Sequence, residues 1–312
     1  MKATTRGALE GWLDALAKRY TLIAPRSVEG ELLYRPVRSS DEVVFDFERT
    51  VLSPKSFFLP DTDVLLEVEI RDGQVSLYEP SPEREQVIFG VRPCDAQGLR
   101  ALDALLLDRP PPDSVYAERR EKTTLIGLAC PRLWDDCFCT SLGSAPDDAS
   151  AVDVMLYVED ASQGTYLVQE VTPRGAELLD LLDAEETDRQ PPASDTLGEE
   201  VPILPAEAWR ALFEEPYWQR LADRCLACHA CTYVCPTCRC FDVRDDTTAA
   251  GPGVAHIQRL RNRYYCKFCY APVDFGAVAC VGCGRCIAVC PVGIDIAEML
   301  ADVAKLAGGT HE

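Results

Sequence analysis

Two stretches of matching spacing decide the fold of this 312-residue chain: CLACHACTYVCP at residues 225–236 and CVGCGRCIAVCP at residues 280–291. In each, four cysteines are separated by two, two and three residues, and a proline follows. This spacing is typical of bacterial-type 4Fe-4S sites, in which the fourth cysteine of each run binds the other cluster. We therefore expect two clusters with crossed ligand sets. The first set is Cys225, Cys228, Cys231 and Cys290, and the second is Cys280, Cys283, Cys286 and Cys235.

The chain has sixteen cysteines, and twelve of them fall between Cys225 and Cys290. In a cytosolic protein such density indicates metal or redox chemistry rather than disulfides, because cytosolic thiols are kept reduced. Zinc is the alternative metal. Zinc sites usually pair two Cys-x-x-Cys motifs, whereas two four-cysteine runs of one spacing favour iron-sulfur clusters. A zinc-stabilised interaction scaffold without a redox role is kept as a hypothesis of a different class.

Residues 1–184 are predicted to form an α/β domain. An apolar run over 87–91, leucines at helical spacing over 95–108 and a second apolar run over 123–128 predict a strand, a helix and a strand, hence a βαβ unit. The other expected elements are helices over 7–20 and 176–182, strands over 42–47, 155–158 and 166–169, and a hairpin made by 64–70 and 75–78.

The C-terminal part is expected to be a separate domain over residues 206–312. The preceding segment, 185–205, is acidic, contains prolines and has no apolar period, so it is predicted to be a linker. Apolar residues at helical spacing lead into Cys225, and a second apolar helix is predicted over 294–306. These helices, together with the long connection between the two cysteine runs, favour an α-helical ferredoxin-like domain that binds the two 4Fe-4S clusters.

Charge and hydropathy exclude several classes of function. The net charge is −20, and residues 1–204 carry almost all of it, which argues against binding to a phosphate backbone and hence against nucleic acid as a partner. The sequence has neither a run of 18 apolar residues nor an N-terminal signal pattern. We therefore expect a cytoplasmic protein without membrane insertion.

Four cysteines lie in the N-terminal part: Cys94, Cys130, Cys137 and Cys139. Their spacing matches no general ligand pattern. However, Cys94 and Cys130 each follow a predicted parallel strand, and the carboxyl ends of such strands meet at one edge of a sheet. Cys94 also begins a predicted helix, whose N-terminus would stabilise a thiolate. The pattern alone leaves open convergence on one site, a single reactive cysteine, or buried thiols.

Motifs in both halves of the chain together resemble one family. They are FGVRPCD at 89–95, Gly98-Leu99, Leu102-Asp103, Cys130-Pro131, CFCTS at 137–141 and CVGCGRC at 280–286. In combination they resemble the iron-sulfur beta subunit of cytoplasmic sulfhydrogenases, which are NAD(P)-linked nickel-iron hydrogenases, and the A-type iron-sulfur subunit of anaerobic sulfite reductases. The similarity covers roughly residues 85–300. The chain departs from the family between the two runs, which are closer together than expected, and at CKFC over 266–269.

The resemblance implies cofactors and partners. It implies a third 4Fe-4S cluster on Cys94, Cys130, Cys137 and Cys139, and an electron-transfer role beside a flavin and NAD(P)-binding subunit. The further partners would be the small and large hydrogenase subunits or a reductase subunit. The sequence has no GxGxxG or GxxxxGK[ST] motif, so no flavin or nicotinamide is expected on this chain.

Three clusters would leave four cysteines: Cys238, Cys240, Cys266 and Cys269. A CxC pair followed by a CxxC pair fits a zinc site or a fourth cluster, and structural thiols are an equal alternative. His229 stands between two expected ligands, but a solvated histidine is the better interpretation. His256 and His311 have no visible partners in the sequence.

No catalytic constellation is evident, and three histidines offer little general-base capacity. We therefore expect a non-catalytic subunit that relays electrons between two partners: a catalytic subunit such as a nickel-iron hydrogenase, and a flavin/NAD(P)-binding subunit. An anaerobic sulfite or sulfur reductase, or a flavin oxidoreductase–heterodisulfide reductase complex, is the alternative setting.

A basic strip lies between the two runs, over residues 256–267, with Arg259, Arg261, Arg263 and Lys267. We predict that it faces a partner or a cluster. Because arginines at every second position would spread around a helix, an irregular or extended segment is expected.

Overall fold

The computed structural model describes residues 1–61, 64, 67–71, 74–78, 84–194, 200–239 and 256–308. The chain divides into two compact units. The first comprises residues 1–133 and 145–195, and the second comprises 134–144 and 196–312. The division differs from the predicted one because an internal stretch, 134–144, packs with the C-terminal unit rather than with its sequence neighbours.

The first unit is built on an eight-stranded sheet with the order β10-β1-β9-β8-β7-β6-β2-β3 among the described residues. Strands β2, β6, β7 and β8 run parallel to their neighbours in this central part, whereas the outer strands join antiparallel. The strands are β1 (Lys2–Thr5), β2 (Thr21–Val28), β3 (Glu31–Pro36), β6 (Gln86–Val91), β7 (Thr123–Leu128), β8 (Val154–Asp160), β9 (Thr165–Glu170) and β10 (Glu185–Glu186).

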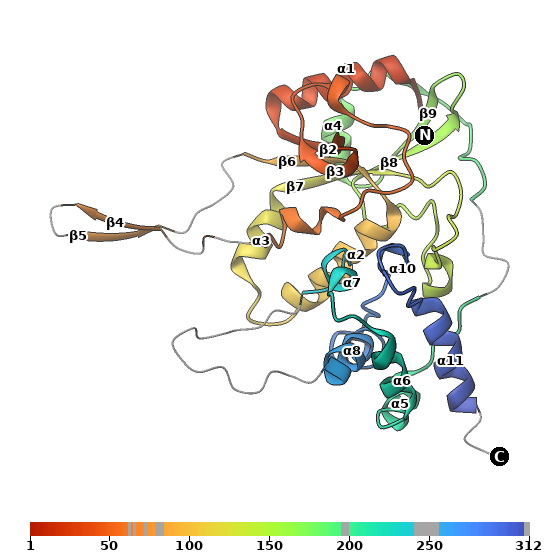
Figure 1. The fold of residues 1–312 in the computed structure, drawn as a ribbon. Helices are drawn as coiled ribbons and strands as arrows, with labels where there is room; N and C mark the ends of the chain where they lie inside the picture. Colours follow the sequence, from red (N-terminus) through yellow and green to blue (C-terminus); the bar gives the residue numbers. More distant parts are fainter. Residues whose placement is uncertain are drawn as a thin grey trace. The chain divides into compact units, whose positions relative to one another are not determined.

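Helices cover both faces of this sheet (Figure 1). Alternation along each strand sends successive side chains to opposite faces, so each face has its own core. Helices α1 (Arg6–Arg19) and α4 (Pro173–Leu179) pack on one face, and α2 (Pro93–Leu106) and α3 (Ser114–Glu121) pack on the other. The predicted βαβ unit is confirmed: it is β6, α2 and β7, and the two strands pair in parallel.

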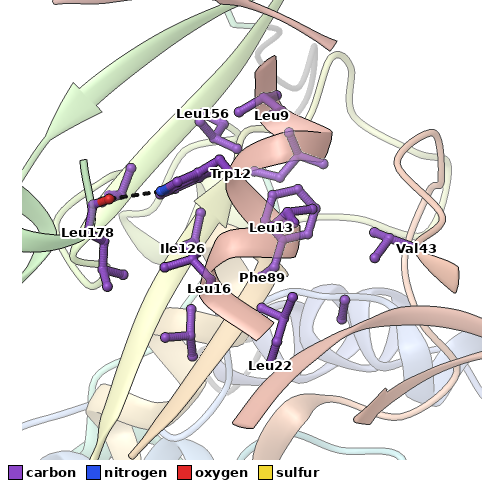
Figure 2. Packing of buried hydrophobic residues seen from close by; sticks show 14 of the residues in the cluster. Leu9, Trp12, Leu13, Leu16, Leu22, Val43, Phe89, Ile126, Leu156 and Leu178 are labelled. Carbon is purple, nitrogen blue, oxygen red and sulfur yellow. Dashed lines mark hydrogen bonds between the residues drawn. The ribbon is translucent and has the colours of Figure 1, made fainter. Parts of the chain in front are cut away.

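The α1 face shows how the sequence forms this core. Leu9, Trp12, Leu13 and Leu16 recur at helical spacing and are buried against the strands, as Figure 2 shows. The indole Nε1 of Trp12 donates to the carbonyl oxygen of Leu178 at 2.8 Å, so its one polar atom is satisfied inside an apolar cluster.

Two predicted elements need correction. The strand expected over 42–47 is wrong: apart from the short 3-10 turn Ser40–Glu42, this stretch has no regular structure. Its alternating apolar residues Val43, Phe45 and Phe47 are buried in the core, which imitates a strand pattern without a ladder. The helix expected over 176–182 begins earlier, at Pro173, because Thr172 caps it by accepting from the Gly175 amide at 3.2 Å.

A separate two-stranded sheet, β4 (Glu67–Arg71) and β5 (Gln74–Tyr78), confirms the predicted hairpin. Val68 pairs with Leu77, and Ile70 pairs with Val75, so the four apolar side chains lie on one face of the hairpin. All four are exposed.

The second unit is helical in its described part. Its elements are η3 (Cys139–Leu142), α5 (Ala206–Ala211), α6 (Tyr217–Arg224), α7 (Ala230–Tyr233), α8 (His256–Tyr265), the π-helix η4 (Cys266–Tyr270), α9 (Ala271–Phe275), α10 (Arg285–Ala288) and α11 (Ile296–Gly308). Its core is aromatic: Trp209 stacks on Phe268 with ring centroids 5.3 Å apart, and Trp218 lies 6.1 Å from Trp209. Val303 and other apolar residues of α11 close the same cluster.

The basic strip is therefore helical, and the expectation of an extended segment is wrong. Leu260 and Tyr264 are four residues apart and both buried in the aromatic core, so they fix one face of α8 inward. The helix then continues through η4, which places Arg263 and Lys267 on consecutive turns.

Candidate metal centres

The two cysteine runs adopt one backbone conformation. In the first run Ala227 and His229 have φ of 55° and 61°, and in the second Gly282 and Gly284, at the same positions of the motif, have φ of 61° and 72°. After these left-handed residues each run enters a short helix, α7 or α10. The shared spacing therefore produces two loops of the same shape.

A first cavity lies at the loop of the first run, with an empty volume of about 470 Å³. Three cysteines of the first run line it together with Cys290, the last cysteine of the second run. The amide of Ile294 donates to the Cys290 sulfur at 3.2 Å. The remaining lining includes Leu260, Arg263, Tyr264, Cys286, Pro291, Val292, Ile294 and Ile296, besides Cys225, Cys228 and Cys231.

A second cavity, of about 310 Å³, lies at the loop of the second run. Three cysteines of that run line it together with Cys235, the last cysteine of the first run. Thus each cavity takes three cysteines from one run and the fourth from the other. Its other lining residues are Phe138, Pro236, Arg263, Lys267, Val281, Gly284 and Ile296, besides Cys280, Cys283 and Cys286.

The donor set at both cavities fits iron-sulfur clusters, which proteins hold by cysteine thiolates. A further sign is the Nε of Arg263, which is enclosed beside both cavities and has no hydrogen-bond partner among the residues that the structure describes. Cluster sulfur would supply an acceptor there. No group of three or more histidine, cysteine, aspartate or glutamate side chains is placed to hold a single metal ion in the described ranges.

The two loops differ in exposure. Residues 226–229 of the first loop are exposed, including Cys228. In the second loop Cys283 is buried, and burial raises its pKa to about 12 and that of Cys280 to about 11. Metal ligation requires the thiolate, so a cation near the second cavity would favour the ligating form.

Lys267 supplies such a cation. It is only 3% exposed, and its Nζ lies 3.2 Å from the Cys235 sulfur, 2.8 Å from Thr237 Oγ1 and 3.0 Å from the Ala279 carbonyl oxygen. A hydrogen bond from Cys238, opposed by burial and helped by the charge of Lys267, holds the pKa of Cys235 well below its usual value. The Cys235 thiolate is therefore stabilised before any metal binds.

The stretch 134–144 packs directly onto the second loop. The Phe138 amide donates to the Gly282 carbonyl oxygen at 2.9 Å, and the Cys137 sulfur lies 3.9 Å from the Cys283 carbonyl oxygen. A Cβ on Gly282 would lie 2.5 Å from the Cys139 nitrogen, and one on Gly284 would lie 2.5 Å from Asp136 Cβ. Glycine is needed at both positions for this close approach.

The four N-terminal cysteines fall in different units. Cys94, in the first turn of α2 after β6, and Cys130, after β7, belong to the first unit, and these parallel strands are neighbours, so both residues lie at one sheet edge. Arg92 joins the strand ends by donating to the carbonyl oxygens of Leu128 and Ala129 at 3.0 and 2.8 Å. Cys137 and Cys139 belong to the second unit. A third cluster on the four stays a prediction.

The four remaining cysteines are placed as follows. Cys238 lies beside Cys235, and Cys269 is buried in the aromatic core, where its sulfur donates to the Ala206 carbonyl oxygen at 3.6 Å. Cys266 is the first residue of η4, and Cys240 lies outside the described residues. A zinc site or fourth cluster on this set stays a prediction. His229 is exposed at the rim of the first cavity, and His311 lies outside the described residues.

Sequence reasoning missed the individual roles of two residues. It grouped Lys267 with the arginines of the strip, although the four-residue spacing of Arg263 and Lys267 is the signal that separates these two from Arg259 and Arg261. Thr237, 1% exposed, accepts from Lys267 and donates to the Ala279 carbonyl oxygen at 2.7 Å, and no motif pointed to it.

Comparison with known proteins agrees with this chemistry. A model described as a 4Fe-4S dicluster domain matches residues 249–294, which include the second cysteine run. The chain is 29% identical over 312 residues to the sulfhydrogenase 2 subunit beta of Pyrococcus furiosus, and the match covers 87% of this chain and 89% of that protein. This confirms the resemblance to the sulfhydrogenase beta subunits. No solved structure matches the chain.

Within the described residues, none of the helices combines the length and the apolar character needed to cross a membrane.

Proposed function

We propose that this chain is an electron-transfer subunit that holds two 4Fe-4S clusters in the second unit, one in each cavity. The observation that carries the proposal is the composition of the cavities. Each is lined by three cysteines of one run and the fourth cysteine of the other, which is the crossed arrangement typical of two-cluster sites. The ligands would be Cys225, Cys228, Cys231 and Cys290 in one cavity, and Cys280, Cys283, Cys286 and Cys235 in the other.

When bound, such clusters accept and release single electrons. The protein contributes binding and environment. Thiolates bind the metal, Tyr264 and Ile296 exclude water from one side of the cavities, and Lys267 and Arg263 place positive charge beside them. At the first cavity, the exposed loop 226–229 leaves one side accessible, and this is the side from which an electron could pass to another protein.

The resemblance to a sulfhydrogenase beta subunit supports a place in a multisubunit oxidoreductase. We propose a cytoplasmic complex with hydrogenase subunits and with a flavin and NAD(P)-binding subunit. We also propose a third cluster on Cys94, Cys130, Cys137 and Cys139. A sulfite or sulfur reductase, or a heterodisulfide reductase complex, is the alternative setting. The subunits that co-purify with the chain identify the complex.

The metal content tests the proposal. Anaerobically purified protein is expected to contain about eight irons with matching acid-labile sulfide for two clusters, or about twelve for three. Zinc without sulfide would contradict the proposal and support the interaction scaffold instead.

The crossing is tested by four matched single variants. Cys290→Ser is expected to abolish the same electron paramagnetic resonance signal as Cys225→Ser, and Cys235→Ser the same signal as Cys280→Ser, because the fourth ligand comes from the other run. If Cys290→Ser removes the signal that Cys280→Ser removes, the ligands do not cross.

A further inference from the structure

Two cations of the helical unit reach the cavities from one side. Arg263 lies in the last turn of α8 and Lys267 in η4, four residues later, so both side chains project from the same helical face. Arg261 of the same strip is placed differently: its guanidinium stacks on the Phe213 ring at 3.6 Å and donates to the Phe213 carbonyl oxygen. Arg261 lines neither cavity.

Lys267 touches the second cavity. Its three ammonium hydrogens can all be used, because the Cys235 sulfur, Thr237 Oγ1 and the Ala279 carbonyl oxygen lie within 3.2 Å of Nζ. Burying an ammonium group is costly unless an anion neutralises it, and Cys235 is the anion in contact. Although burial alone would lower the pKa of Lys267, the Cys235 charge raises it well above its usual value. Lys267 is therefore a permanent positive charge.

Arg263 touches both cavities. One of its amino groups donates to the carbonyl oxygen of Cys231, a cysteine of the first cavity, at 3.2 Å. Its guanidinium also hydrogen-bonds Cys286, whose thiol borders both cavities. Since the enclosed Nε has no partner among the described residues, one donor remains for an acceptor inside the cavities.

We propose that Arg263 and Lys267 are buried counter-ions that raise the reduction potentials of the bound clusters: Lys267 acts on the cluster of the second cavity alone, and Arg263 acts on both. The proposal rests on the proposed function, since it needs a cluster in each cavity. The two residues are positioning residues, because they act on the clusters through charge and hydrogen bonds.

The physical reason is the charge change on reduction. The cluster gains one electron from its donor without a proton, and so it becomes more negative. A buried environment opposes this change, whereas a nearby cation stabilises the reduced form, and the attraction is strong where water is excluded. The second cavity is the more buried one, and it receives the additional cation. Lys267 thus offsets burial and keeps the second cluster able to exchange electrons with the exposed first one.

The test is a redox titration of the anaerobically purified full-length chain, monitored by electron paramagnetic resonance. Lys267→Met removes the charge and nearly keeps the length. It is expected to lower the equilibrium constant for reduction of the second cluster at least tenfold, which is 59 mV for one electron. The first cluster, assigned through the Cys225→Ser signal, is expected to shift by less than threefold. Arg263→Gln is expected to lower both potentials.

Arg261→Gln is the matched control. It removes a positive charge from the same helix without touching a cavity, and both potentials are expected to stay within twofold of the wild type. The Lys267→Met shift is also expected to persist in 1 M salt, where exposed charges are screened within about 3 Å.

Metal content separates the possible failures. Wild-type protein without iron and sulfide would refute the proposed function itself. Iron-replete Lys267→Met and Arg263→Gln proteins with unchanged potentials would refute the inference while leaving that function intact. If Lys267→Met does not hold the second cluster, Thr237→Val and Lys267→Arg, which keep the positive charge, decide: the inference requires that both retain the cluster with a potential within threefold of wild type, and a tenfold loss in either overturns it.

Discussion

The two cysteine loops have the same spacing and the same backbone conformation, yet they carry different residues at the two left-handed positions. The first loop has Ala227 and His229 there, and the second has Gly282 and Gly284. A left-handed conformation costs a residue with a Cβ about 1–2 kcal/mol. The first loop therefore tolerates a strain that the second does not carry. Ligand geometry alone requires the conformation but does not require glycine.

The difference follows from what lies against each loop. Backbone atoms of 136–139 approach Gly282 and Gly284 so closely that a Cβ would overlap them. The equivalent residues of the first loop are exposed, so their side chains extend freely into solvent. Glycine in a cluster-binding loop thus reports a second chain segment packed on the loop.

The largest expected effect comes from filling that close approach. Gly282→Ala places a Cβ 2.5 Å from the Cys139 nitrogen and also adds left-handed strain, so we expect a loss of about 4 kcal/mol. The measurements are the thermal denaturation midpoint and the iron content of anaerobically purified protein. Because 134–144 packs on this loop, the signal of the second cluster is expected to change first.

Gly276→Ala is the control for this variant. Gly276 has a φ of 69° but no atom within 4 Å of a built Cβ, so the substitution carries strain alone, about 1–2 kcal/mol. If both variants lose the same stability, the close approach of 136–139 does not constrain the loop.

An intermediate effect is expected on metal removal. The first loop exposes Cys228, whereas Cys283 of the second is buried, so a chelator reaches the first cavity more readily. Under anaerobic chelation we expect about four irons per chain to be lost in a fast phase, together with the signal that Cys225→Ser removes. Simultaneous loss of both signals would show that exposure of the loop does not control access to iron.

The smallest effect is expected from the reciprocal substitution. Ala227→Gly relieves the left-handed strain but increases the entropy of the unfolded chain, so a net stabilisation of about 0.5 kcal/mol is expected. The measurement is again the denaturation midpoint at unchanged iron content. A destabilised variant would indicate that the methyl group of Ala227 makes a stabilising contact.

Some of this structure was predictable because it follows from local pattern. The apolar runs of β6 and β7 and the leucines of α2 specified a βαβ unit, since buried parallel strands read as continuous apolar stretches. The cysteine spacing likewise predicted which four cysteines line each cavity. In both cases the decisive residues lie within short stretches whose geometry is fixed by the backbone.

The rest depends on contacts between distant residues. The two-residue strand β10 forms only because Glu185 and Glu186 pair with β1, and nothing in the acidic sequence signals that pairing. The packing of 134–144 on the second loop is equally nonlocal, although Gly282 and Gly284 recorded it indirectly. Arg263 and Lys267 were recognised as basic, but only the helical geometry of α8 and η4 separates them from the exposed charges.

Because each cavity draws cysteines from both runs, the timing of synthesis affects assembly. Residue 290 leaves the ribosome well after residue 231, and at 5–20 residues per second the interval is roughly 3–12 s. Throughout that interval the thiols of the first run lack the fourth cysteine that lines their cavity. Cells that make this protein would therefore need to protect the nascent thiols, or deliver iron and sulfide only after the second run has emerged.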